Sequence, residues 1–216
     1  MSTNGFIEFK PWSSFLMSSP IVIDGKGHVA GRLAGVVAKQ LLNGKSIVVL
    51  RAEDIVVNGE YRFNHHKYRR FLNKTTNTNP RRGPFHQRAP SEMFLRTVRG
   101  MVNYRTARGA TAFDRLKVFE GIPPKYVHAP RVVVPAALRV VAINNLRPVT
   151  KLGKIGTVYG WKYGDVVARN EEERKESAHK AYLQKIEEEQ RRARAIEAAN
   201  KQLGEAAVRF IETFVE

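Results

Sequence analysis

The feature that most constrains the fold is an apolar strand–helix–strand pattern within residues 21–50. Ile21-Val22-Ile23 predicts a short buried strand, and the turn-like segment 24–27 follows it. Apolar residues then recur at the i, i+3, i+4, i+7 spacing of one helix face; they are Ala30, Leu33, Ala34, Val37 and Leu41. A second apolar run at 46–50 predicts a strand covered on both faces. Together these segments predict a βαβ unit with parallel strands.

The middle of the chain predicts shorter elements. A strand at 55–57 ends at the turn signal Asn58-Gly59, and 64–73 suits a short cationic helix. Residues 74–90 collect Asn, Thr, Pro and Gly, which predicts an extended loop. Ser91 is then expected to be the N-cap of a helix. The apolar face of this helix is expected to comprise Met93, Phe94, Thr97, Val98 and Met101.

The end of the chain has a different composition. After a strand at 116–119 and short elements at 132–135 and 138–143, the sequence from Glu171 onward is rich in Glu, Arg, Ala and Lys, a strongly helical mixture. Its apolar stripe, interrupted by Glu189 and Asn200, predicts an amphipathic helix lying on a partner or on the body. The stripe comprises Tyr182, Ile186, Ala193, Ile196, Leu203, Ala207, Phe210 and Phe214.

These patterns predict an α/β protein: a central, mostly parallel sheet flanked by helices, with extended basic loops and a long C-terminal helical extension. The expected divisions are an N-terminal extension at 1–20, an α/β domain at 21–150 and a mainly helical extension at 151–216.

Charge is the strongest indication of function. The chain carries 37 Lys and Arg against 20 Asp and Glu, a formal net charge of +17. The segment 62–108 is almost purely cationic and also contains aromatic residues, with Glu92 as its single acid. Cations neutralise phosphates, and aromatic and guanidinium planes stack on unpaired bases. Nucleic acid is therefore the favoured partner, with an anionic membrane surface as the second choice.

Other sequence features narrow the cellular compartment in which we expect the protein. The sequence has no cysteine and no apolar run long enough to cross a bilayer. The opening residues lack the pattern of a signal or transit peptide, so we expect an intracellular protein.

Three chemical motifs have simpler structural explanations. The glycines 25, 27 and 31 depart from dinucleotide-binding spacing, although Glu53 or Asp54 is placed where a ribose-binding acid would be. The adjacent histidines 65 and 66 lack partners that would complete a metal site. No pairing of carboxylate, histidine and nucleophile is evident. We therefore expect no catalytic residue, metal, cofactor or small-molecule substrate.

Several ordered motifs resemble one family, the universal large-subunit ribosomal protein L-thirteen family, and some resemble its eukaryotic (L-thirteen-a type) branch. The family motifs include His28-Val29-Ala30-Gly31-Arg32-Leu33-Ala34, Val57-Asn58-Gly59, Lys67-Tyr68, Arg99-Gly100-Met101 and the segment 115–121. Arg108-Gly109-Ala110 and the segment 134–138 resemble the archaeal and eukaryotic branch, and Gly160-Trp161-Lys162-Tyr163 resembles the eukaryotic one. The resemblance covers about residues 20–185.

The resemblance implies a structural constituent of the large (60S) subunit that binds folded rRNA and supports assembly and translation. It implies a cytoplasmic location on the ribosome, nucleolar assembly, and neighbouring ribosomal proteins as partners, reached through the C-terminal helix. By matching motif, the RNA-facing residues are Arg32, Lys67, Arg69, Arg70, Arg99 and Arg108. Charge density adds Arg62, Lys74, Arg81, Arg82, His86, Arg88, Arg96 and Arg105.

Two other functions remain open from the sequence. A nucleotide-dependent RNA-modifying enzyme would use the glycine-rich turn after the first strand and would bind a dinucleotide or methyl donor. A free RNA-binding regulator would be found outside any particle.

Overall fold

The computed structural model describes residues 20–215, with side chains through residue 201. The chain divides into two compact units after Ala168, and each is described by itself. Of the expected N-terminal extension, residues 1–19 lie outside the described part. The boundary expected at residue 150 falls within a strand, β5 (Val149–Lys151).

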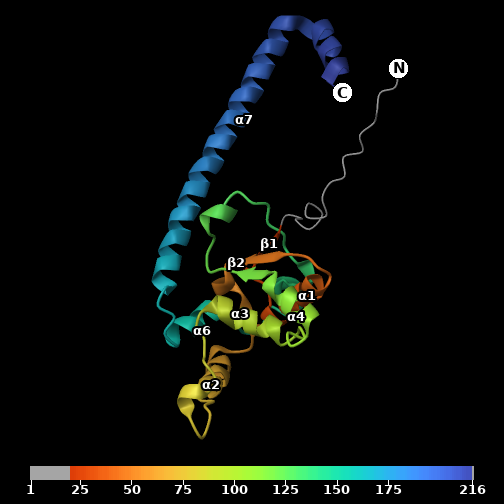
Figure 1. Cartoon of the computed structure of the whole chain (residues 1–216). Helices are drawn as coiled ribbons and strands as arrows, with labels where there is room; N and C mark the ends of the chain where they lie inside the picture. Colours follow the sequence, from red (N-terminus) through yellow and green to blue (C-terminus); the bar gives the residue numbers. More distant parts are fainter. Residues whose placement is uncertain (1–19, 216) are drawn as a thin grey trace, which may run out of the picture. The chain divides into compact units, whose positions relative to one another are not determined.

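A parallel three-stranded sheet forms the centre of the first unit (Figure 1). Its order is β1 (Ile21–Asp24), β2 (Ile47–Leu50), β4 (Leu116–Val118). The helix α1 (Ala30–Leu42) connects the first two strands, whose register pairs Ile21 with Ile47. This confirms the predicted βαβ unit. A single parallel bridge between Ile23 and Val132 continues the sheet beyond β1.

The remaining elements flank this sheet. The strands β3 (Val56–Asn58) and β5 form a separate antiparallel pair. The other helices of four or more residues in this unit are α2 (Tyr61–Leu72), α3 (Pro90–Arg99), α4 (Ala107–Asp114), α5 (Arg139–Ala142) and α6 (Leu152–Val158). The predicted fold class, α/β with a mostly parallel sheet and a long C-terminal helix, is confirmed.

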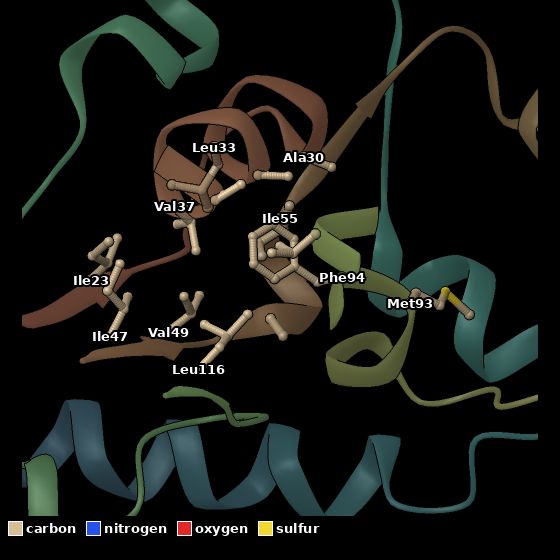
Figure 2. Close-up of a cluster of buried hydrophobic side chains, with 14 of the residues drawn as sticks. Ile23, Ala30, Leu33, Val37, Ile47, Val49, Ile55, Met93, Phe94 and Leu116 are labelled. Carbon is tan, nitrogen blue, oxygen red and sulfur yellow. The ribbon is translucent and has the colours of Figure 1, made fainter. Parts of the chain in front are cut away.

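The core lies where α1 and α3 pack together beside the sheet (Figure 2). All four residues of β2 are buried, as the continuous apolar run predicts for a strand covered on both faces. Leu33 and Val37 from α1 meet Phe94 from α3, and each of these side chains is fully buried. Burial of side chains of this size contributes about 1.5–3 kcal/mol each, so this cluster fixes α1 and α3 firmly.

Two details of the predicted α3 are wrong. The helix begins at Pro90 with Ala89 as its N-cap residue, because proline fits the first turn without needing a backbone N–H. Ser91 is therefore inside the helix, and its hydroxyl donates to the Glu120 carboxylate at 2.5 Å. Met101 lies beyond the end of α3 and is 46% exposed, so it does not belong to the apolar face.

The described part of the second unit, residues 169–215, lies within the long helix α7 (Gly164–Val215). An ion pair with a 2.7 Å contact joins Arg174 to Glu171 one turn earlier. Tyr182 and Ile196 of the predicted stripe are exposed in the described chain, at 61% and 60%. The side chains of Leu203, Ala207, Phe210 and Phe214, the last four of the stripe, lie outside the described residues.

Candidate nucleic-acid interface

The helix α2 is cationic on one face and anchored on the other. Asn64 is buried, while Tyr68 and Phe71 on the same side are half-buried. The rest of the helix surface exposes the predicted cations Arg62, Lys67, Arg69 and Arg70. Because a helix turns 100° per residue, this arrangement follows from the sequence spacing once Asn64 is placed inward.

Asn64 attaches the start of α2 to the two-stranded sheet. Its Nδ2 donates to the carbonyl oxygens of Asn58 at 3.2 Å and Gly59 at 3.0 Å, and to the Thr150 hydroxyl at 3.1 Å. The Thr150 hydroxyl in turn donates to the Gly59 carbonyl at 2.9 Å. Gly59 has a φ of +105°, a backbone conformation that favours glycine. This network fixes the position of α2 at its first turn.

Aromatic side chains hold the rest of the inner face. The His65 ring stacks on Tyr159 with centroids 5.1 Å apart, and the Tyr68 ring lies tilted 5.1 Å from the same tyrosine. The Tyr159 hydroxyl donates to the His65 carbonyl at 2.8 Å. Burial raises the pKa of Tyr68, so its hydroxyl stays protonated and donates to the Gln87 carbonyl at 2.6 Å. We call α2 and the loop after it, residues 61–89, the basic finger (Figure 1).

The loop of the basic finger has a defined path. Asn79 accepts a hydrogen bond from the Arg81 N–H at 3.1 Å and caps the short 3₁₀ helix Pro80–Arg82. The His86 Nε2 lies 2.9 Å from the Lys74 carbonyl, across the base of the loop. A Cβ on Gly83 would come within 2.9 Å of the Thr76 nitrogen, so the chain crosses itself too closely for any other residue. The expected loop is thus closed by contacts of its own.

The loop exposes most of its predicted site residues. Lys74, Arg81, Arg82 and Arg88 are all exposed. His86 differs, because its ring is half-buried and lies edge-on to Phe71 at 4.5 Å. The contacts that His86 makes in the structure hold the loop against α2.

A second group of cations follows on α3 and the segment after it. The Arg96 guanidinium lies 3.4 Å from the Phe71 ring centroid, which joins α3 to the basic finger. Arg99 lies over the Tyr104 ring at 4.2 Å. Hydrogen bonds from Arg99 and Arg105, with their charges, lower the pKa of the exposed Tyr104. These three arginines are exposed, so they extend the cationic surface.

The two remaining predicted residues lie elsewhere on the first unit. Arg108 is exposed, and its guanidinium donates at 3.4 Å to the Leu42 carbonyl at the end of α1. Arg32 is exposed on α1 and lines a shallow hollow of about 290 Å³ together with Asn58, Asn144 and Arg147. The structure therefore brings Arg32 beside Arg147, a cation that the sequence analysis did not select.

Two carboxylates of the first unit pair with cations outside the basic finger. Asp24 pairs with Arg51, whose Nε donates to the Asp24 Oδ1 at 2.9 Å. Burial acts to raise the pKa of Asp24, but the hydrogen bonds from Arg51 and from the Lys26 N–H, with nearby positive charge, hold it below its usual value. Asp54 binds Lys151 at 2.7 Å. From Tyr61 to Ser91 the sequence contains no carboxylate, so the basic finger is uniformly positive.

Packing explains the first glycine of the glycine-rich turn. The Gly25 N–H donates to the Leu50 carbonyl at 2.8 Å, and a Cβ on Gly25 would overlap that oxygen and Ile55. The Glu53 carboxylate, a candidate ribose ligand, accepts the Gly121 N–H at 3.0 and 3.1 Å. Burial raises the pKa of Glu53. The Gly25 N–H and the Glu53 carboxylate therefore both bind backbone groups elsewhere in the fold.

Comparison with known families identifies the chain. Residues 18–125 match the family model described as Ribosomal protein L13. The chain belongs to this family. The ribosomal protein L13 match covers half of the chain and runs from β1 through β4, so it includes the whole basic finger.

Membership in the L13 family makes this chain a structural ribosomal protein of the large subunit. The family is one of structural ribosomal proteins rather than enzymes. Within residues 20–201, His, Asp and Glu side chains do not gather in any group of three suited to a metal ion. Among the described helices, none combines the length and apolarity needed to span a membrane.

Two exposed aromatic residues of the basic finger were not selected from the sequence. Phe63 on α2 is 67% exposed and Phe85 in the loop is 86% exposed. His86 was selected because of the charge density around it, and neither phenylalanine was selected as a site residue. The run Pro84-Phe85 within a polar loop was the available signal, since such a loop offers no core to bury a phenylalanine.

Proposed function

We propose that this L13-family protein docks on the rRNA of the large, 60S subunit through its basic finger and the neighbouring arginines of 96–108. It supports subunit assembly and translation by neutralising folded RNA. One observation carries the proposal: the finger is anchored by Asn64 and by aromatic contacts, and all its cations face outward with no carboxylate among them. Such a surface attracts phosphates and carries no negative side chain that would repel them.

The proposed mechanism is mainly electrostatic. Each phosphate that Lys or Arg neutralises releases condensed counterions, so affinity for RNA falls steeply with salt. The anchored helix presents its cations in a fixed geometry, which favours a folded RNA of matching shape over a particular sequence. The predicted RNA-facing residues remain those of the finger, with Arg32, Arg96, Arg99, Arg105 and Arg108.

The experiment replaces three exposed arginines of the loop, Arg81, Arg82 and Arg88, with alanine in the full chain. We expect poor incorporation into large subunits and a thermal midpoint close to that of the wild type, because the three side chains are exposed. Replacing Arg191, Arg192 and Arg194 of α7 removes the same charge and is the matched control. Normal incorporation of the loop variant would overturn the proposal.

The finer assignments belong to the same proposal. The resemblance to the eukaryotic branch supports a cytoplasmic ribosome, with assembly in the nucleolus. The predicted α/β domain, 21–150, would carry the RNA contacts, and the C-terminal extension would contact neighbouring ribosomal proteins through the apolar stripe of α7. Co-sedimentation of the chain with large subunits on sucrose gradients at moderate and high salt tests this. A pool that remains at the top at both salts would instead support a free regulator.

A further inference from the structure

Phe85, in the loop, is more exposed than Phe63, the other exposed phenylalanine of the basic finger. It is 86% exposed, whereas the neighbouring rings Tyr68 and Phe71 are half-buried against the body. Burying a phenylalanine contributes about 1.5–3 kcal/mol, and Phe85 keeps most of its surface available for a contact outside the chain.

The loop backbone holds Phe85 outward from both sides. Before it, Gly83 sits where any Cβ would meet the Thr76 nitrogen at 2.9 Å and the Pro80 carbonyl at 3.1 Å. After it, His86 is fixed by the Lys74 carbonyl and by the Phe71 ring. Because Gly83 and His86 hold the loop on either side of Pro84 and Phe85, the Phe85 side chain projects without a large loss of loop entropy on binding.

The surroundings of Phe85 select the kind of partner. Arg81, Arg82 and Arg88 flank it, all exposed, and no carboxylate lies within 61–91. A phenylalanine in a loop whose charged side chains are all cations suits a polyanion that also offers flat apolar rings. Unpaired RNA bases have that combination, because each base carries a stacking face next to a phosphate.

We propose that Phe85 stacks on an unpaired base of the bound RNA while the flanking arginines contact the adjacent phosphates. The ligand of this part of the finger is therefore a loop, bulge or single-stranded junction, and not the side of a continuous duplex. This rests on the proposed function, since it names the kind of RNA that the same surface binds.

The test uses the full-length protein and two RNA probes of equal length: a hairpin with an unpaired adenine loop, and a fully paired duplex. One loop adenine is replaced by 2-aminopurine, whose fluorescence falls when it stacks. Base–aromatic stacking contributes about 1–3 kcal/mol, so Phe85→Leu is expected to weaken hairpin binding roughly 5- to 150-fold and to reduce the quenching. Duplex binding should be unchanged, and Phe85→Trp should retain both hairpin affinity and quenching.

The outcomes separate this inference from the proposed function. If Phe85→Leu binds the hairpin like the wild type while the triple arginine variant binds both probes weakly, base stacking is refuted and RNA docking stands. If the triple arginine variant also binds both probes normally, the proposed function fails as well. Impaired subunit incorporation of Phe85→Leu with unchanged hairpin affinity and quenching would refute stacking and place the ring against a neighbouring protein.

Discussion

Replacing Asn64 with aspartate tests most sharply how α2 is anchored. The two side chains have the same shape, but an ionised aspartate cannot donate to the carbonyl oxygens of Asn58 and Gly59, which lie 3.2 and 3.0 Å from Nδ2. Each buried carbonyl that loses its donor costs about 1–3 kcal/mol. The Thr150 hydroxyl can turn toward the new carboxylate and recover part of that loss. We therefore expect Asn64→Asp to destabilise the first unit by about 3 kcal/mol at pH 7.

The assay combines urea denaturation with amide hydrogen exchange. With a slope of about 2 kcal/mol per molar urea, the loss corresponds to a midpoint lower by about 1.5 M. Amides of α2 should lose protection before those of α1, because the lost hydrogen bonds join the start of α2 to the turn after β3. The matched control is Asn145→Asp, which makes the same change at an exposed position.

The pH dependence of the variant gives a second check. Burial raises the pKa of a carboxyl at position 64, and a protonated carboxyl can donate again. The difference in stability between Asn64→Asp and the wild type should therefore shrink as the pH falls toward 5. An unchanged midpoint at pH 7, or unchanged exchange in α2, would refute the proposed anchoring.

Two further predictions concern the body of the fold. Gly109→Ala should destabilise the protein by about 2–4 kcal/mol, because its Cβ would lie 1.8 Å from the Asn103 carbonyl oxygen. The control is Gly35→Ala, in open space on α1, which should raise the thermal midpoint. Equal effects of the two substitutions would refute the packing argument. His28 is buried, and its Nε2 accepts the Val134 N–H at 3.1 Å. Burial lowers the pKa of His28 below its ordinary 6.5. As the pH falls below 6.5, His28 therefore takes up a proton in the unfolded chain before it does so in the folded chain, which favours unfolding. Thermal melts between pH 7 and pH 5 should thus show a larger loss for the wild type than for His28→Gln, and equal losses would contradict this.

The elements that the sequence predicted well have apolar periodicity strong enough to specify them alone. Residues 21–50 contain two apolar strands and a helix with a complete buried face, and the structure has all three. The helix α4 was missed because only Gly109 and Ala112 of its eight residues are buried, which leaves no apolar stripe.

The helix α6 was missed because close packing requires glycines within it. Its glycines disfavour a helix, but a Cβ on Gly153 would lie 3.0 Å from Glu53, and one on Gly156 would lie 3.1 Å from the Arg88 carbonyl. The tertiary fold therefore requires the residues that weaken the local signal. Ser91 shows the same effect, because its hydroxyl serves Glu120, 29 residues away, and not the helix end.

The sequence predicted the charge of the candidate site but not the contacts that hold it in place. Exposed positions for thirteen of the fourteen selected residues follow from the high cost of burying lysine or arginine. The anchoring role of Asn64 depends on Thr150, which is 86 residues distant, so no local pattern could reveal it. The contrast between Phe85 and His86 depends likewise on how the loop closes on Phe71.

The most direct test of RNA docking by the basic finger is ultraviolet crosslinking of intact large subunits, followed by mass spectrometry of the crosslinked peptides. We expect RNA adducts in peptides from 61–89 and 96–108, including the peptide that contains Phe85, with fewer adducts on the exposed part of α7. Adducts confined to α7, or an uncrosslinked finger in subunits that contain the protein, would contradict RNA docking through this surface.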